Sequence, residues 1–240
     1  QSVYYTLTLI YGNGAENGRI VIEEGQTPDI PAEPEFGPHK FLGWYSEGDP
    51  YDWTTPVMRD IEITALWEKA YGGEMHTVYG SFETVDGAYL SRTANSLMVN
   101  EEDGFDRGTI EVSVTAGTAS DNGIALCLTG NGTNTFWESD VSYYLFFLSR
   151  DGTAYLGKVD HGKWLALKVV ALSDYDVSQT YVLKTVLNGT DISCYVDGKL
   201  YIRYSERAFL TGTGYGLRAG AAGVVFSDFK ISGECYQMSA

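Results

Sequence analysis

Short runs of alternating apolar and polar residues follow one another along the whole chain, and this pattern predicts β-strands rather than helices. From Val3 to Trp67 the runs are YYTLTLIY, GRIVIEE, KFLGWY and IEITALW, with a proline-rich loop before the third. The following stretch, EKAYGGEM, has no apolar periodicity and contains Gly72-Gly73. We therefore expect a boundary there, with one domain at 1–70 and a second at 74–240.

The second domain has short strands about every 8 to 12 residues with turn signals between them, which is typical of a two-sheet antiparallel sandwich of the jelly-roll, concanavalin A-like type. Three hairpins are expected at Asp151-Gly152, Asn188-Gly189 and Asp197-Gly198, because glycine accepts the positive φ of a tight turn. The predicted strands are HTVYGSFE, GAYLSR, GTIEVSVTA, GIALCLT, VSYYLFFLS, TAYLGKV, KWLALKVVA, TYVLKTVLN, DISCYVD, KLYIRYS, GYGLRAG and GVVFSDFKIS.

The hairpin around Asp151-Gly152 is unusually apolar. If these two residues form a two-residue turn, Leu148 pairs with Tyr155 and the hairpin has two distinct faces. One face would carry Tyr144, Phe146, Leu148, Arg150, Tyr155 and Val159, and the other Tyr143, Leu145, Phe147, Leu156, Lys158 and Asp160. One face meets the facing sheet. The second either exposes aromatic rings as a binding surface or is covered, so that the strand is buried on both sides.

Polar and aromatic residues precede this hairpin: Trp137, Glu138 and Asp140 lie in the loop that enters it. An aromatic plane covers the apolar face of a sugar ring, and carboxylates accept hydrogen bonds from vicinal hydroxyls. We therefore predict a carbohydrate site, although the tryptophan could instead close the core edge and the acids could be solvated. The full set of candidate sugar-binding residues is Trp137, Glu138, Asp140, Tyr143, Arg150, Lys158, Trp164, Arg203 and Arg218.

Charge and composition narrow the function classes. The 240 residues carry a formal net charge of −16, which disfavours binding to nucleic acid or to an anionic membrane surface, and no apolar run is long enough for membrane insertion. The chain starts at Gln1 without a signal-peptide pattern, so either a signal peptide has been removed or the chain is an excised piece of a longer polypeptide, which we favour. Two of the three cysteines, Cys127 and Cys194, lie in apolar strands and are expected to be buried thiols.

The first domain resembles the Listeria-Bacteroides repeat, also called the internalin B-repeat. The similarity rests on the opening strand with YGNG, the VIEEGQ turn, KFLGWYSEG, DWTTPV and the closing ITALW. This resemblance implies a small β-grasp-like spacer on a secreted or cell-surface bacterial protein. The aromatic content of this segment also fits a small folded domain. The side chains that can form its core are Trp44, Tyr45, Trp53 and Trp67.

The second domain resembles the concanavalin A-like and laminin G-like sandwiches, and among these carbohydrate-binding module family 66. The similarity rests on YVLKTVLNGTDISCYVDGKLYI and on the closing LTGTGYGLRAGAAGVVFSDFKISG. It implies non-catalytic binding of a glycan, of levan or inulin type, through a terminal fructose. Positions that contact ligand in that family are not matched clearly here, so the resemblance assigns no single residue.

Catalytic and metal chemistry have less support. Sandwich glucanases carry ExDxxE on one strand, and here Glu138 and Asp140 are followed by Tyr143 where the third carboxylate would stand. No cofactor is expected. The acidic turn NEEDGFDRG, 100–108, could bind calcium but lacks the full ligand series, and a solvated acidic loop is favoured.

The sequence thus predicts non-catalytic carbohydrate binding, possibly of a fructan, by one module of a larger secreted or cell-surface protein. Two alternatives stay open: an adhesion or structural module that contacts a protein partner, and a β-sandwich glycoside hydrolase.

Overall fold

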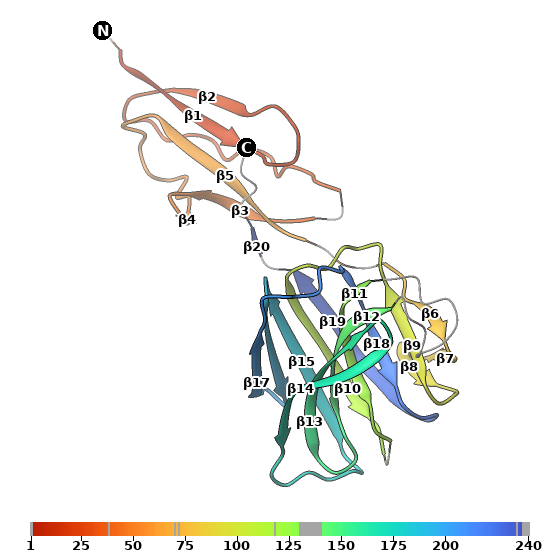
Figure 1. Ribbon diagram of the computed structural model, residues 1–240. Helices are drawn as coiled ribbons and strands as arrows, with labels where there is room; N and C mark the ends of the chain where they lie inside the picture. Colours follow the sequence, from red (N-terminus) through yellow and green to blue (C-terminus); the bar gives the residue numbers. More distant parts are fainter. Residues whose placement is uncertain are drawn as a thin grey trace. The chain divides into compact units, whose positions relative to one another are not determined.

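The computed structural model describes residues 2–37, 39–69, 71, 73–117, 119–129, 141–233 and 235–236. The chain forms two compact units, residues 1–70 with 233–240, and residues 71–232 (Figure 1). Both units are built from β-strands, and no helix occurs among the described residues. Accordingly, no described segment meets the length and apolarity that a membrane-spanning helix requires.

The first unit is a single mixed sheet around an aromatic core. Its strands are β1 (Tyr4–Ile10), β2 (Gly18–Glu23), β3 (Lys40–Ser46), β4 (Asp49–Pro50) and β5 (Ile61–Glu68), in the spatial order β2-β1-β5-β3-β4. Strands β1 and β5 run parallel. Trp44 and Trp67 are buried in the core and Trp53 packs against it, as the sequence predicted. Strand β20 (Cys235–Tyr236) pairs with β5, so the end of the chain joins this unit rather than the second.

The second unit is a sandwich of two seven-stranded antiparallel sheets, which confirms the predicted fold class (Figure 1). The β10 sheet has the order β17 (Lys199–Ser205), β16 (Asp191–Val196), β15 (Thr180–Asn188), β10 (Gly108–Thr115), β19 (Val225–Gly233), β8 (Ala88–Ser91) and β7 (Phe82–Val85). The β12 sheet has the order β14 (Lys163–Ala171), β13 (Thr153–Asp160), β12 (Ser142–Leu148), β11 (Asn122–Thr129), β18 (Gly214–Ala219), β9 (Ser96–Asn100) and β6 (His76–Tyr79).

One predicted strand proves to be two. The run HTVYGSFE is divided by a bend at Gly80, whose φ of 76° suits glycine. The two short strands belong to different sheets, β6 next to β9 and β7 next to β8. A continuous alternation of apolar residues therefore does not reveal where a chain crosses from one sheet to the other.

The main core lies between the sheets and follows the alternation of each strand. Ile110, Val112 and Val114 of β10 face inward, as do Tyr144 and Phe146 of β12. Cys127 and Cys194 are buried here and are free thiols, as expected. Burial raises the pKa of the Cys127 thiol to about 12, so this group stays protonated and unreactive at neutral pH.

The hairpin of β12 and β13 has a register one residue away from the predicted one. Its loop has three residues, Arg150, Asp151 and Gly152, with Ser149 bonded to Thr153 and Gly152 at φ 77°. Leu148 therefore pairs with Ala154 rather than with the next residue, and every side chain of β13 changes face. Tyr155 and Val159 share the face of Tyr143, whereas Leu156 and Lys158 face the core with Tyr144.

The expectation that β12 exposes aromatic rings is wrong. All residues of Ser142–Leu148 are buried, and Tyr143 and Tyr144 are 1% and 0% exposed. The outer face of the β12 sheet carries a second apolar cluster of its own: Leu97, Val99, Ala125, Leu128, Val141, Tyr143, Leu145, Phe147 and Val159. The alternative of a strand buried on both sides is therefore confirmed.

A buried charge network joins β12 and β13 to the segment after β17. Lys158 Nζ donates to Glu206 Oε1 at 3.2 Å and to the Ala208 carbonyl oxygen at 3.2 Å. The Tyr144 and Tyr204 hydroxyls also donate to the Glu206 carboxylate. Burial acts to raise the pKa of Glu206, but these hydrogen bonds outweigh it and hold the pKa below its ordinary value.

Replacement of Glu206 should therefore have a pH-dependent cost. Since the pKa in the folded chain is lower than in the unfolded chain, the ionised carboxylate stabilises the fold above about pH 4.5 and ceases to do so as the pH falls through the folded pKa. We predict that Glu206→Gln lowers the free energy of unfolding at pH 7, and that the difference from wild type shrinks below about pH 4.5. Urea unfolding between pH 7 and pH 3 measures this difference.

The matched control is Glu102→Gln, which changes an exposed glutamate of the same unit. It should leave the free energy of unfolding within about 0.5 kcal/mol of wild type at each pH. A Glu206→Gln difference that stays constant or grows as the pH falls would contradict the role assigned to this network.

Candidate functional site

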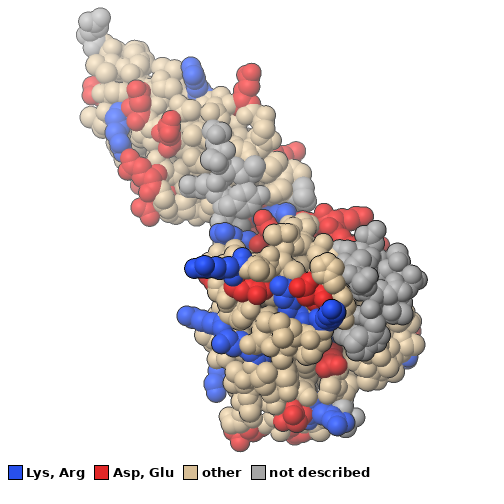
Figure 2. Space-filling view, viewed as in Figure 1, with Lys and Arg blue, Asp and Glu red and all other residues tan. Residues whose placement is uncertain are grey.

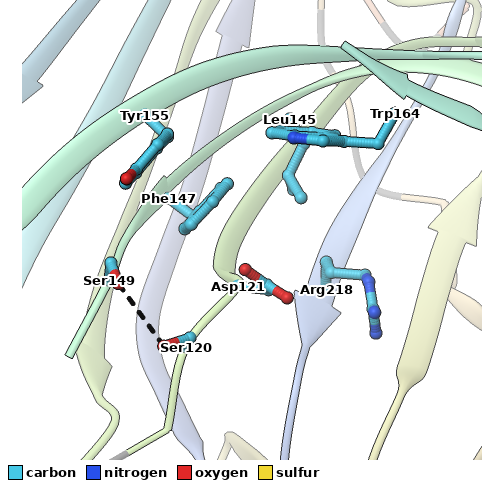
Figure 3. A pocket seen from close by; sticks show the side chains of 8 residues that line it. All are labelled: Ser120, Asp121, Leu145, Phe147, Ser149, Tyr155, Trp164 and Arg218. Carbon is cyan, nitrogen blue, oxygen red and sulfur yellow. Dashed lines mark hydrogen bonds between the residues drawn. The ribbon is translucent and has the colours of Figure 1, made fainter. Parts of the chain in front are cut away.

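A hollow of about 390 Å³ opens on the outer face of the β12 sheet (Figure 3). We call it the outer hollow. It is lined by Ser120, Asp121, Leu145, Phe147, Ser149, Tyr155, Trp164 and Arg218. These residues come from β12, β13, β14 and β18 and from the loops that flank β11 and β12, so the sheet itself fixes their positions.

Glycine and alanine residues lie next to the large side chains that line this hollow. Gly157 of β13 pairs with Leu145 of β12, and Gly123 of β11 pairs with Phe147 of β12. On the same face, Ala125 of β11 pairs with Leu145 on one side and Gly216 on the other. Small residues thus stand beside large ones in adjacent rows of the sheet, and the large ones form the floor of a depression.

Three aromatic rings form one side of the outer hollow. The rings of Phe147 and Tyr155 are stacked, with centroids 5.0 Å apart and an interplanar angle of 5°. The Trp164 ring lies 5.8 Å from Phe147 at an angle of 51°. Phe147 is buried and Tyr155 is half-buried, whereas Trp164 is 39% exposed. Trp164 therefore presents an indole surface to the solvent at the mouth of the hollow.

The position of the Trp164 indole depends on Gly157. A Cβ built on Gly157 would approach the indole ring atoms Cη2, Cζ2 and Cζ3 to 1.9, 2.4 and 2.5 Å. The indole therefore lies flat against the backbone of β13, in space that any other residue at position 157 would occupy. Because the sheet holds the ring on one side, its other side is presented with little loss of side-chain entropy on binding.

Polar groups line the opposite side. The Ser120 and Ser149 hydroxyls are 3.4 Å apart, and the Arg150 amide donates to Ser120 Oγ at 3.4 Å (Figure 3). Asp121 has a φ of 61°, in the left-handed region, and its carboxylate lines the hollow. Among the described residues of the lining, Asp121 supplies the single carboxylate. Hydroxyl groups and a carboxylate therefore face the aromatic rings across the hollow.

Arg218 is a charged side chain held in a fixed position at this polar side. It is 2% exposed, and its guanidinium donates to the Ala219 carbonyl oxygen at 2.9 Å and to Asn95 Oδ1 at 3.1 Å. Its Cζ lies 5.8 Å from the centroid of the Tyr79 ring. Burial raises the pKa of the neighbouring Tyr143 well above its ordinary value, so that hydroxyl remains neutral beside the guanidinium.

The structure places some of the predicted site residues together and separates others. Trp164 and Arg218 line the outer hollow, and Tyr143 is buried on the same face of the sheet. Arg150 is exposed in the hairpin loop beside the hollow. Lys158 does not belong to the site, because the one-residue change of register turns it inward to Glu206.

Two other groups of predicted residues lie elsewhere. Trp137, Glu138 and Asp140 fall outside the described residues, so the predicted cluster before β12 remains a prediction. Arg203 lines a separate polar hollow of about 440 Å³ on the β10 sheet, with Asn188 and Asp191. The sequence offered no means of telling that Arg203 and Arg218 belong to opposite sheets.

Sequence reasoning missed most of the polar side of the outer hollow, namely Ser120, Asp121 and Ser149. It also placed Tyr155 on the wrong face. A signal was present in the chain, since glycines interrupt the apolar strands GIALCLT and TAYLGKV at positions 123 and 157. A glycine inside a strand marks a place where another group approaches closely.

The acidic turn considered for calcium has structural contacts. Asn100 Oδ1 accepts from the amides of Glu102 and Asp103, and Asp103 Oδ2 accepts from the Tyr215 hydroxyl at 2.7 Å. Among the described residues, no group of three His, Cys, Asp or Glu side chains is arranged to hold a metal ion. Calcium binding by this chain stays untested.

Comparisons with solved structures identify the fold of the sandwich. A protein of unknown function with a galectin-like fold from Bacillus subtilis matches 68% of this chain and 90% of its own length, with 14% identity and a TM-score of 0.53. The carbohydrate-binding module CBM66 from Bacillus subtilis matches 65% and 94% at 19% identity and a TM-score of 0.48. A β-glucanase from Bacillus licheniformis matches 70% and 92% at 12% identity and a TM-score of 0.49.

No protein-family model matches the sequence, and no curated protein matches it either. The likeness to the first of these structures shows the fold alone, and this fold agrees with the antiparallel sandwich predicted from the strand pattern. The similarity of the first unit to the Listeria-Bacteroides repeat stays a prediction.

The contact between Gly157 and Trp164 can be tested by a double-mutant cycle. We predict that Gly157→Ala lowers the free energy of unfolding by about 1 to 3 kcal/mol, because the added methyl group meets the indole. In a Trp164→Ala background the same change should cost less than about 0.5 kcal/mol, since the methyl group then has room. Equal costs in both backgrounds would show that the indole does not occupy this space.

Proposed function

We propose that the sandwich unit binds carbohydrate non-catalytically, and that the outer hollow is the binding site. The observation that carries this proposal is the position of Trp164, which is 39% exposed and lies flat over Gly157 at the mouth of a hollow that also contains Asp121. A large aromatic ring that stays in contact with water at the mouth of a hollow is typical of a ligand platform.

The lining supplies the two kinds of contact that a sugar ring requires. The indole face covers the C–H face of the ring, while the Asp121 carboxylate and the Ser120 and Ser149 hydroxyls accept or donate hydrogen bonds at its edge. Arg218 contributes positive charge from a fixed position and is an additional candidate donor. A shallow preformed site of this kind binds with modest affinity, which multivalency raises when modules are linked.

The resemblance to carbohydrate-binding module family 66 makes a fructan the first ligand to test, through a terminal fructose of a levan-type or inulin-type polymer. This assignment is finer than the lining itself supports, because ring faces, a carboxylate and hydroxyls recognise many sugars. We further propose that the first unit is a spacer, and that both units belong to a larger secreted or cell-surface protein.

Two other functions remain as outcomes of the test. An adhesion module would use the same face against a protein partner and give no response to glycans. A glucanase would release reducing ends from polysaccharide, and this needs two suitably placed carboxylates. At the position of the third carboxylate of the glucanase pattern stands Tyr143, which is buried.

Calorimetric titration of the full chain with levan, inulin and a set of plant glycans tests the proposal. We predict binding to at least one of them. Trp164→Ala should weaken that binding at least tenfold, because it removes the central aromatic contact, and Asp121→Asn should weaken it severalfold, because it removes the charge that strengthens the hydrogen bonds to hydroxyls.

The matched control is Leu165→Ala. Leu165 is 58% exposed on the same strand but pairs with Lys158, on the other face of the sheet. The Leu165→Ala variant should therefore bind glycan with the affinity of the wild type. Binding that survives Trp164→Ala unchanged would exclude the outer hollow as the site, and the absence of heat with every glycan would favour the adhesion module.

A further inference from the structure

A β-bulge gives the outer face of β14 an unusual composition. Leu156 of β13 pairs with Lys168, but the next residue, Gly157, pairs with Ala166, so Leu167 is an extra residue on β14. Up to Ala166 the even-numbered residues share the face of Trp164. Beyond the bulge the alternation is reversed, and the odd-numbered residues take that face.

The bulge turns one cation away from the outer hollow. Without it, Lys168 would share the face of Trp164. With it, Lys168 stands opposite Leu156, which faces the core, and Val169 stands opposite Tyr155, which lines the outer hollow. Leu167 and Val170 pack against the core, which agrees with this assignment of faces. The outer face of β14 therefore carries Trp164, Ala166, Val169 and Ala171.

This apolar strip continues the aromatic side of the outer hollow to the edge of the sheet. Val169 is 50% exposed next to Tyr155, and Ala166 and Ala171 are exposed as well. The polar groups of the lining come from the other direction, from the loops beside β11 and β12 and from β18. The site is thus divided into a polar part, with hydroxyl, carboxylate and guanidinium groups, and a mainly apolar part toward β14.

We propose that the site takes a sugar unit that carries an apolar substituent, such as an alkyl or aryl aglycone, with the sugar in the outer hollow and the substituent on the strip of β14. This inference rests on the proposed carbohydrate binding. The occupant is identified by continuity with the hollow and by chemistry, because Ala166, Val169 and Ala171 offer no hydrogen-bonding side chain to the hydroxyls of a second sugar. The bulge acts as a specificity device, since it replaces Lys168 by Val169 beside Tyr155.

The experiment compares methyl and benzyl glycosides of D-fructofuranose, D-glucopyranose, D-galactopyranose and D-mannopyranose by titration calorimetry on the full chain. For the sugar that binds, the benzyl glycoside should bind roughly tenfold more tightly than the methyl glycoside. This is the gain expected when on the order of 60 Å² of apolar surface leaves water.

Two variants test whether the strip is responsible. Val169→Ser should remove most of the gain, and Val169→Lys, which puts a cation where the bulge excludes one, should remove all of it. Both should leave binding of the methyl glycoside within about twofold of wild type. The control Leu165→Ser lies on the same strand but on the other face, and it should keep the gain.

The outcomes separate this inference from the proposed function. If methyl and benzyl glycosides bind equally, if Val169→Ser retains the gain, or if polysaccharides bind while no benzyl glycoside does, the inference is overturned and carbohydrate binding stands. If no glycan and no glycoside gives heat, the proposed function fails and the inference fails with it.

Discussion

The apolar character of both faces of the β12 sheet is the constraint on which the rest of the sandwich depends. A strand such as SYYLFFL cannot turn one face to water, since its odd and even positions are equally apolar, and all of its residues are buried. The inner face packs against the β10 sheet, and the outer face forms a second apolar cluster. The outer hollow lies on this outer face, where Gly123 and Gly157 pair with the floor residues Phe147 and Leu145.

The contact with Gly157 explains how the exposed Trp164 ring is held in place. Trp164 stands on β14, at the edge of the sheet, where its neighbours are mostly exposed. Because Gly157 provides a flat surface, the indole packs against backbone instead of leaving the protein. Charged side chains occur both at the edge of the core and on the surface of the sandwich. Lys158 and Glu206 neutralise each other at the edge of the core, whereas Figure 2 shows Lys and Arg side chains beside Asp and Glu side chains on the visible surface of the sandwich.

Sequence reasoning predicted the class of fold and most strands of both units, because alternation and turn residues are local signals. It missed β9, β4 and β20. It failed where a single residue changes the geometry. The three-residue loop at Asp151 shifted β13 by one position, which moved Tyr155 into the site and Lys158 out of it. One apparent strand also proved to be divided between two sheets near Gly80. Register, bulges and the partners of each sheet depend on contacts between distant segments, so they could not be read from one local pattern. Trp164 and Arg218 were predicted as site residues, but their common location could not be.

The central claim is that the outer hollow, with the Trp164 indole at its mouth, is where this chain binds sugar. The most direct measurement is a titration of the ¹⁵N-labelled chain with the bound glycan, followed by ¹H–¹⁵N correlation spectra. The account predicts the largest shift changes at the Trp164 indole N–H and at the amides of Gly157 and Asp121. Changes confined to Asn188 and Arg203 on the β10 sheet, or to the first unit, with the Trp164 signal unmoved, would contradict it.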